Sequence, residues 1–147
     1  MQITKVTSNK KQYLPLLLLA DEEEAMIDRY LERGTMYVLE DGDVKAECLV
    51  TDEGDGILEI KSLATLPQFQ HRGYAKALVN FIETKYKDRF KILQAGTGDS
   101  PATVPFYQKL GFIRSHIIKN FFTDNYSRPI YDGGVLLTDM VYLRKKL

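Results

Sequence analysis

Two basic residues, His71 and Arg72, stand directly before a glycine at the start of a helical sequence. They belong to the stretch QHRGYA, residues 70 to 75, and Lys76 follows it. Backbone N–H groups at a helix N-terminus have no partner inside the helix, so they can bind an anion. Gly73 allows the backbone to approach a ligand closely, and the side chains of Arg72 and Lys76 add positive charge. The stretch therefore predicts either a phosphate site or the plain start of a solvated surface helix.

Several other kinds of site lack their sequence patterns. GTGDSP, residues 96 to 101, has a proline where a dinucleotide-binding fingerprint has its third glycine, and no G-x-x-x-x-G-K-[ST] stretch is present. Two histidines and a single cysteine, Cys48, do not have the spacing of a metal site. The sequence therefore does not support hydride transfer, P-loop chemistry or metal catalysis, and we expect no bound metal.

Two segments together resemble the GNAT superfamily of N-acetyltransferases. The first is Q-x-x-G-x-A at residues 70 to 75, and the second is FYQKLGF at residues 106 to 112. The first pattern is loose by itself, but it becomes specific in combination with the second. The expected order of strands and helices fits the superfamily over nearly the whole chain. The resemblance implies an acyltransferase that uses acetyl-coenzyme A (acetyl-CoA) as its co-substrate.

The resemblance also implies where acetyl-CoA would lie. In this fold two central, roughly parallel strands splay apart, here EIKSLAT at 59 to 65 and FKILQAG at 90 to 96. Backbone groups of the first strand would pair with the pantetheine arm, and N–H groups near Gly73 would bind the pyrophosphate. Ser100 stands where many relatives carry an asparagine that holds the coenzyme. The residues implied at acetyl-CoA are Leu63, Ala64, Thr65, Gln70, His71, Arg72, Gly73, Tyr74, Ala75, Lys76, Ser100 and Phe106.

Transfer of an acetyl group to an amine needs a neutral amine, donors for an oxyanion and a proton for the leaving thiolate. An alkylamine has a pKa near 10.4, so its neutral form costs roughly 4–5 kcal/mol at pH 7. By resemblance, Tyr107 is the tyrosine beside the sulfur and would act as the general acid. The alternative for Tyr107 is a core aromatic residue that packs a short helix.

Glu59 is the candidate general base. It lies 11 residues before Gln70, which is the spacing of the catalytic glutamate in histone acetyltransferases of this superfamily. Simple strand alternation would place Glu59 on the same face as Lys61 and Leu63. The alternative is a solvated strand carboxylate with no catalytic role.

The acceptor site in such folds is formed by the early helices and the loop before the last strand. Here both segments combine carboxylates with aromatic rings, which attract and hold cationic amines. We therefore expect a small-molecule amine or a peptide amino group as acceptor, although solvated acids and a packed loop explain the same residues. The candidates are Glu22 to Glu24, Tyr30, Phe121, Phe122, Asp124, Tyr126, Tyr131 and Asp132.

Periodicity and turn residues predict one α/β (α+β) domain over residues 1 to 147, in the order βααβββαβαββ. Strands are expected at 1–7, 35–40, 44–52, 57–66, 90–97, 112–122 and 135–145, with helices at about 11–33, 74–87 and 100–110. Two prolines delay the start of the last helix to about Thr103, and Gly111 ends it. The fold class is a mixed, mostly antiparallel twisted sheet, splayed at its centre, with helices on both faces.

Composition sets further limits. The 147 residues are 44% hydrophobic and 27% charged, and their net charge is zero. Residues 1–60 carry 6 Lys and Arg against 14 Asp and Glu, whereas residues 61–147 carry 14 against 6. This asymmetry fits either chance clustering or a chain that meets an anion with its second half and a cation with its first. Cys48 lies in the apolar run AECLV and is expected to be a buried free thiol.

The sequence also bears on membrane association and on functions other than catalysis. The apolar run at 14 to 20 is too short for a membrane span and has no cleavage site, so we expect a cytoplasmic protein with no membrane partner. One alternative is a non-catalytic sensor that binds acetyl-CoA, and retention of both Glu59 and Tyr107 argues against it. Another is a nucleic-acid-binding module, but the cations do not form one stripe and no nucleic-acid partner is expected. A homodimer is compatible with the sequence.

Overall fold

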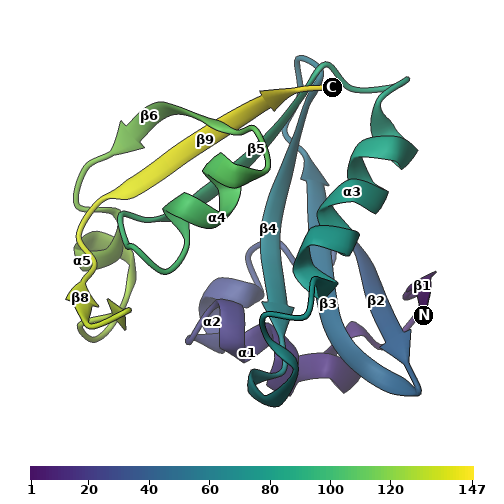
Figure 1. Cartoon of the computed structure of the whole chain (residues 1–147). Helices are drawn as coiled ribbons and strands as arrows, with labels where there is room; N and C mark the ends of the chain where they lie inside the picture. Colours follow the sequence, from purple (N-terminus) through teal and green to yellow (C-terminus); the bar gives the residue numbers. More distant parts are fainter.

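The chain forms a seven-stranded sheet with helices on both faces. The structure is a computed structural model that describes residues 1–147. The strands lie in the order β1-β2-β3-β4-β5-β9-β6, and only β4 and β5 are parallel neighbours. The elements, labelled in Figure 1 except for β7, are β1 (Gln2–Lys5), α1 (Leu14–Ala20), α2 (Glu24–Ile27), β2 (Thr35–Asp41), β3 (Asp43–Asp52), β4 (Ile57–Thr65), α3 (Tyr74–Tyr86), β5 (Ile92–Gly98), α4 (Val104–Lys109), β6 (Ile113–Ile118), α5 (Phe121–Asn125), β7 (Tyr131–Asp132), β8 (Val135–Leu136) and β9 (Met140–Lys146).

Each face of the sheet has its own apolar core. Leu78 and Ile82 of α3 and Tyr107 of α4 belong to the larger core. Leu17 of α1 and Ile27 of α2 belong to the smaller one. Helices α3 and α4 therefore cover one face, which is nearer the viewer in Figure 1, and α1 and α2 cover the other. The predicted fold class is confirmed. None of the helices combines the length and the apolar composition that a bilayer span requires.

The two parallel strands at the centre separate after a short paired stretch. Ile57 to Ile60 of β4 pair with Ile92 to Ala95 of β5, but β4 continues to Thr65 and β5 to Gly98. Figure 1 shows β4 and β5 diverging from the point where they are paired. Beyond Ile60, β4 therefore has β3 as its only strand neighbour. The predicted splay of the two central strands is confirmed.

A β-bulge in β4 changes which side chains share a face. Ile60 and Ser62 pair with successive residues of β3, so Lys61 is an extra residue between them. The extra residue reverses the alternation of the side chains that follow it. Glu59 and Ser62 consequently lie on the α1 side of the sheet, while Leu63 packs against the core on the α3 side. The expectation that Glu59 and Leu63 share a face is wrong.

Residues 119 to 139 differ from the predicted strand, loop and strand. The strand predicted to reach residue 122 ends at Ile118, and α5 follows it. The end of the predicted loop and the first residues of the predicted last strand form the small hairpin β7–β8, and the last strand begins at Met140 rather than near residue 135. Asn120 has a left-handed φ of 57°, which ends β6. The segment then packs into a third small core made of Phe122, Ile130 and Leu137.

Candidate active site

A cavity of about 470 Å³ lies where β4 and β5 diverge. Helix α1 and helix α4 both contribute to its walls. Because these helices lie on opposite faces of the sheet, the cavity is accessible to groups from both faces. Its lining residues include Leu18 to Glu22 after and within α1, Ile60 to Leu63 of β4, residues 96 to 98 of β5, Thr103, Tyr107, Phe122, Tyr126, Ile130, Tyr131, Asp132, Leu137 and Met140.

Tyr107 lies in the wall of this cavity on the α4 side. Helix α4 begins after Thr103, as predicted, and Gly111 has a φ of 93°, as expected for the residue that ends it. The Tyr107 ring packs edge-on against Phe106 at 5.1 Å and Phe112 at 5.3 Å between ring centroids. Burial raises the pKa of the Tyr107 phenol above its ordinary value. The hydroxyl therefore keeps its proton at neutral pH.

The predicted phosphate stretch forms the start of α3. Gly73 is the residue that precedes the helix, with a left-handed φ of 87°, and His71 is left-handed too at 63°. The first N–H of the helix with a helical partner is that of Ala77, which donates to the Gly73 carbonyl over 3.0 Å. The backbone N–H groups of the preceding turn, including those of Ala75 and Lys76, consequently have no helical acceptor.

Basic side chains surround this helix start. The side chains of His71, Arg72 and Lys76 are exposed. Lys45 of β3 lies 3.9 Å from the centre of the Phe69 ring, and the Arg72 guanidinium lies 5.2 Å from the same ring. Lys45 also forms an ion pair with Asp43, so the exposed positive charge at the turn before α3 comes mainly from Arg72 and Lys76, beside the free backbone donors.

Two side chains of the same stretch hold the turn in place. Gln70 Nε2 donates to the Thr65 carbonyl over 3.3 Å, which ties the turn to the end of β4. The Tyr74 hydroxyl donates to Asp41 over 2.6 Å. Gln70 and Tyr74 therefore support the turn through contacts within the protein.

The β5 side of β4 beyond Ile60 is free of strand partners. Leu63, Ala64 and Thr65 pair only with β3, and Leu63 also lines the cavity. This edge offers unpaired backbone N–H and C=O groups to an extended ligand. The predicted pantetheine segment thus lies at an open strand edge.

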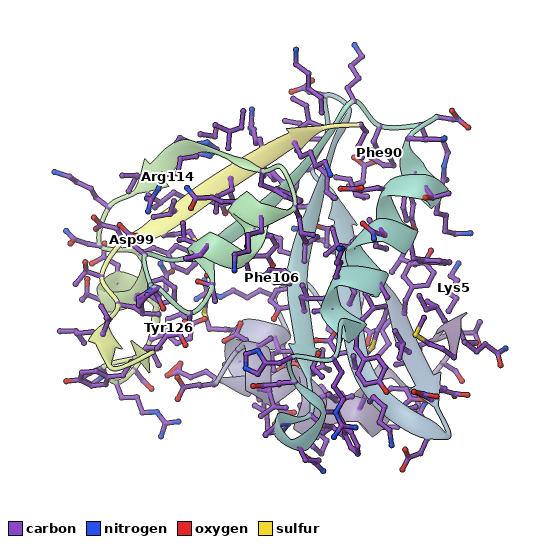
Figure 2. The ribbon with its side chains drawn as sticks, in the orientation of Figure 1. Lys5, Phe90, Asp99, Phe106, Arg114 and Tyr126 are labelled. Carbon is purple, nitrogen blue, oxygen red and sulfur yellow. The ribbon has the colours of Figure 1, made fainter.

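Ser100 and Phe106 do not line the cavity. Ser100 is buried, and its Oγ accepts from the Ala102 N–H over 3.0 Å and donates to the Asp132 carbonyl over 3.4 Å. Phe106 packs against the larger core and lies between α4 and α3 in Figure 2. Both side chains shape the surroundings of α4.

Glu59 does not line the cavity either. It is only 3% exposed, and its carboxylate forms an ion pair with Lys61 at 2.7 Å. Gln94 of β5 donates to the same carboxylate and accepts from the Nε of Arg144 in β9 over 2.9 Å. Glu59 is therefore one member of a polar row that crosses three strands, and only Lys61 of this row reaches the cavity.

The predicted acceptor residues are divided by the structure. Glu22, Tyr126 and Asp132 line the cavity together with Phe122 and Tyr131. In Figure 2, Tyr126 lies beside α5, away from α3. The remaining acids are engaged elsewhere or lie outside the cavity: Glu23 accepts from the Ser127 N–H, Glu24 pairs with Lys11, and Asp124 lies on α5 outside the lining.

Asp21 is a cavity carboxylate that the sequence did not single out. Its Oδ1 accepts from the Tyr126 hydroxyl over 2.7 Å, and its Oδ2 accepts from the Tyr30 hydroxyl over 3.1 Å. Burial raises the pKa of the Asp21 carboxyl, and the two tyrosine hydrogen bonds offset part of that rise. Asp21 directly follows the apolar run of α1, which was the available signal, but three more acids after it hid the distinction.

A second missed group is the pair formed by Ser62 and Glu47. Ser62 lines the cavity, and its Oγ donates to Glu47 Oε1 over 2.5 Å. Glu47 is fully buried on β3. The sequence did contain a signal here, since Glu47 is a lone acid within the apolar run AECLV.

Comparisons with known proteins agree with this geometry. A family model described as an acetyltransferase (GNAT) domain matches residues 32–114. The protein YvbK of Bacillus subtilis, described as an uncharacterized N-acetyltransferase, is 36% identical over 131 residues, which are 87% of this chain and 84% of that protein.

Solved structures are similar over nearly the full length. A GNAT family acetyltransferase from Elizabethkingia anophelis with acetyl-CoA bound has a TM-score of 0.92 at 34% identity, and the match covers 99% of this chain and 97% of that one. A Bacillus subtilis acetyltransferase in complex with CoA has a TM-score of 0.89 at 32% identity, covering 99% and 98%. The resemblance carried by QHRGYA and FYQKLGF is confirmed: the chain belongs to the GNAT family of acetyltransferases.

Proposed function

We propose that residues 1–147 form one catalytic domain that moves an acetyl group from acetyl-CoA to a primary amine by direct attack in a ternary complex. The observation that carries this proposal is the cavity through the splayed sheet. It is lined by Tyr107 from one face and by Asp21 and Ser62 from the other. Two substrates can therefore meet there from opposite faces. Cys48, the only thiol, is fully buried outside the lining, so a covalent acetyl-enzyme on it is not supported.

Acetyl-CoA fits the α3 and α4 side of the cavity. The open edge at Leu63, Ala64 and Thr65 would pair with the amides of the pantetheine arm. The free N–H groups after Gly73 would bind the pyrophosphate, helped by the nearby cations. The relatives crystallised with acetyl-CoA or CoA support this assignment.

Tyr107 would supply the proton that the departing thiolate needs. Its phenol stays protonated at neutral pH because of burial, and it reaches the cavity. An alkyl thiol has a pKa near 8.5, and its thiolate leaves more readily when a neighbouring acid donates a proton to the sulfur. Tyr107 therefore acts on the leaving group and not on the amine.

The amine would enter from the α1 side. Asp21 and Glu22 place carboxylates around the cavity there, and Tyr126 adds an aromatic ring, while Tyr131 and Asp132 of β7 complete the lining near the start of α4. Such walls attract a cation and hold it over ring faces. We propose a cationic small-molecule amine or a peptide amino group as the acceptor class.

A second copy of the chain is the proposed partner at β6. This strand is an edge of the sheet, and it exposes Ile113 at 73% and Ile117 at 57%. Exposed apolar edge strands are sites where another copy can pair. Molar mass measured by light scattering over a range of concentrations tests the homodimer, and a monomer at every concentration would contradict it.

A thiol-release assay tests the enzymatic function. Acetyl-CoA is supplied with matched pairs of cationic amines and neutral compounds, and free CoA is measured. We expect release only with amines, and initial-rate lines that intersect, as a ternary complex requires. Parallel lines would indicate a covalent intermediate instead. Tight binding of acetyl-CoA with no release for any amine would favour the non-catalytic sensor.

A further inference from the structure

Glu47 is a carboxyl group that the proposed reaction has not yet used. It lies on β3 opposite Val38 of β2 and Ala64 of β4, and none of its surface is exposed. Its Oε1 accepts from Ser62, whereas its Oε2 has no hydrogen-bond partner. Burial raises the pKa of Glu47 to about 8, and the hydrogen bond from Ser62 lowers it in part. An ionisable group is thus held away from water with a single hydrogen-bond partner.

Packing alone does not account for a glutamate at this position. A buried charge or an unpaired buried oxygen is costly, and an apolar side chain of similar volume would serve a purely structural role better. Perturbed carboxyl groups of this kind gather at functional sites. Ser62 connects Glu47 to the cavity, because Ser62 is both its hydrogen-bond partner and a lining residue.

Ser62 and Glu47 lie where the proposed reaction still lacks a group, namely one that removes a proton from the acceptor amine. The bulge at Lys61 turns Ser62 toward the α1 side of the sheet, where the acceptor amine would lie. Asp21 also lies on that side, but both of its oxygens already accept tyrosine hydrogen bonds, which suits it to hold a cation. Glu59 is bound into its polar row and does not line the cavity.

We propose that Ser62 and Glu47 form a two-residue path that takes the proton from the acceptor amine, an inference that rests on the proposed function. The N–H bond of the ammonium breaks as its proton passes to Ser62 Oγ. The Ser62 O–H bond breaks at the same time, and that proton passes to Glu47 Oε1. The amine becomes neutral with its lone pair free to attack, and Glu47 becomes a neutral carboxylic acid. Ser62 touches the substrate, and Glu47 acts through it as a positioning residue.

The groups around Glu47 do not compete for this proton. Tyr30 after α2, Cys48 on the same strand and Tyr107 on α4 lie near enough to sense its charge. Burial raises the pKa of each of the three, so all of them are neutral at pH 7. Glu47 is therefore the group whose ionisation would change across the neutral range, and its carboxylate is the active form above about pH 8.

The profile of kcat against pH, measured by thiol release, tests the path. For the wild type we expect kcat to rise with pH through about 8. E47Q keeps the shape of the side chain but cannot accept the proton, so it should lose this limb and about 100-fold or more in kcat. S62A should lose the same limb while Glu47 is intact, and S62T, which restores the hydroxyl, should recover it. D21N should keep the limb while its KM for the amine rises.

Two further measurements separate this inference from its alternatives. If Glu47 were merely structural, E47Q would lower the melting temperature and leave the limb in place, and that result would overturn the proposal. Infrared titration of the carboxyl band, wild type minus E47Q, does not depend on turnover. It should show Glu47 titrating near pH 8, and at a higher pH in S62A, because the hydrogen bond from Ser62 favours the ionised form. Absence of turnover with every amine would contradict the proposed function. A Glu47 carboxyl that is already ionised at pH 6 would contradict the proton path alone.

Discussion

The Tyr107 hydroxyl keeps its proton because the ring is buried between two other aromatic rings. Phe106 and Phe112 hold the ring edge-on, so its orientation depends on packing and not on hydrogen bonds. A substitution that removes only the hydroxyl should therefore leave the packing intact. This separates the chemistry of Tyr107 from its structural role.

Y107F tests that separation. We expect kcat to fall by about 100-fold, since general acid catalysis contributes roughly this much, while KM for both substrates changes little. The melting temperature should stay near the wild-type value because the ring contacts remain. Q108A is the control: Gln108 lies on the same helix, is exposed and does not line the cavity, so this variant should keep the wild-type kcat. An unchanged kcat in Y107F would show that the thiolate leaves without this proton.

The raised pKa of Glu47 also predicts how the free energy of unfolding depends on pH. Its folded pKa is about 8, above the ordinary value of 4.5, so between these values the folded state keeps a proton that the unfolded state loses. The free energy of unfolding should therefore fall as pH rises from about 4.5 to about 8, by roughly 3–5 kcal/mol from this group.

Urea unfolding of the wild type and E47Q at several pH values measures this effect. The glutamine of E47Q does not titrate, so the free energy of unfolding of E47Q minus that of the wild type should increase as the pH rises. E32Q, which removes an exposed carboxylate, is the control and should follow the wild type. A constant difference between E47Q and the wild type across the range would contradict the raised pKa.

At the scale of elements, the sheet followed from alternation and turn residues. The meander of β2, β3 and β4 is joined where DGD and EGDG stand in the sequence, and α3 starts directly after Gly73. The bulge at Lys61 leaves no mark in composition, because one extra residue in a strand looks like any other. Alternation alone could therefore not predict that Glu59 and Ser62 lie on the same face of the sheet.

The segment from 119 to 139 shows a different limit. Its residues, such as Phe122 and Ile130, favour strands as well as helices, and their conformation is decided by contacts with one another. The left-handed backbone at Asn120 is compatible with an asparagine but not dictated by it. Tertiary contacts fixed what local preference left open. Similarly, Asp21 stood out only once two tyrosines from distant segments were seen to donate to it.

The turn before α3 can be tested with a matched pair of glycines. Gly73 and Gly54 have nearly the same φ, 87° and 85°, and a Cβ added at either would meet no atom within 4 Å. Valine is strained at such a φ in both places. G73V should raise KM for acetyl-CoA by about tenfold or more and leave KM for the amine nearly unchanged.

G54V is the control, because Gly54 lies in the turn between β3 and β4, at the opposite end of β4 from the start of α3, and carries the same backbone strain away from the N–H groups of α3. It should lower stability by a similar amount with little effect on either KM. Equal effects of G73V on both KM values would argue against pyrophosphate binding at this turn.

At the scale of the whole molecule, the acidic and basic halves of the sequence are only partly separated in space. Asp21 and Glu22 come from the acidic half and Arg72 and Lys76 from the basic half. Lys45 from the acidic half, however, joins the basic side chains near α3, where its ring contact with Phe69 and its ion pair with Asp43 hold it. The fold thus presents positive charge on the expected acetyl-CoA side and negative charge on the expected amine side.

This arrangement predicts a dependence on salt for both substrates. Raising the ionic strength from about 0.05 M to about 0.5 M shortens the Debye length from roughly 14 Å to roughly 4 Å, so attraction to exposed charges weakens. KM should rise for acetyl-CoA and for a cationic amine, while kcat changes little. A neutral dephosphorylated pantetheine thioester is the control for the first effect. A KM for acetyl-CoA that does not respond to salt would contradict a role for the exposed cations.

The third small core has a consequence for how this protein could change its substrate. Phe122, Ile130 and Leu137 hold residues 119 to 139 together largely by contacts within that segment. The two large cores use none of these side chains. This part of the proposed amine-side wall therefore packs largely apart from the sheet, to which hydrogen bonds such as that from Tyr126 to Asp21 join it. We expect that a grafted segment from another family member would redirect the enzyme to a new acceptor while leaving the proposed acetyl-CoA side and the folding of the sheet intact.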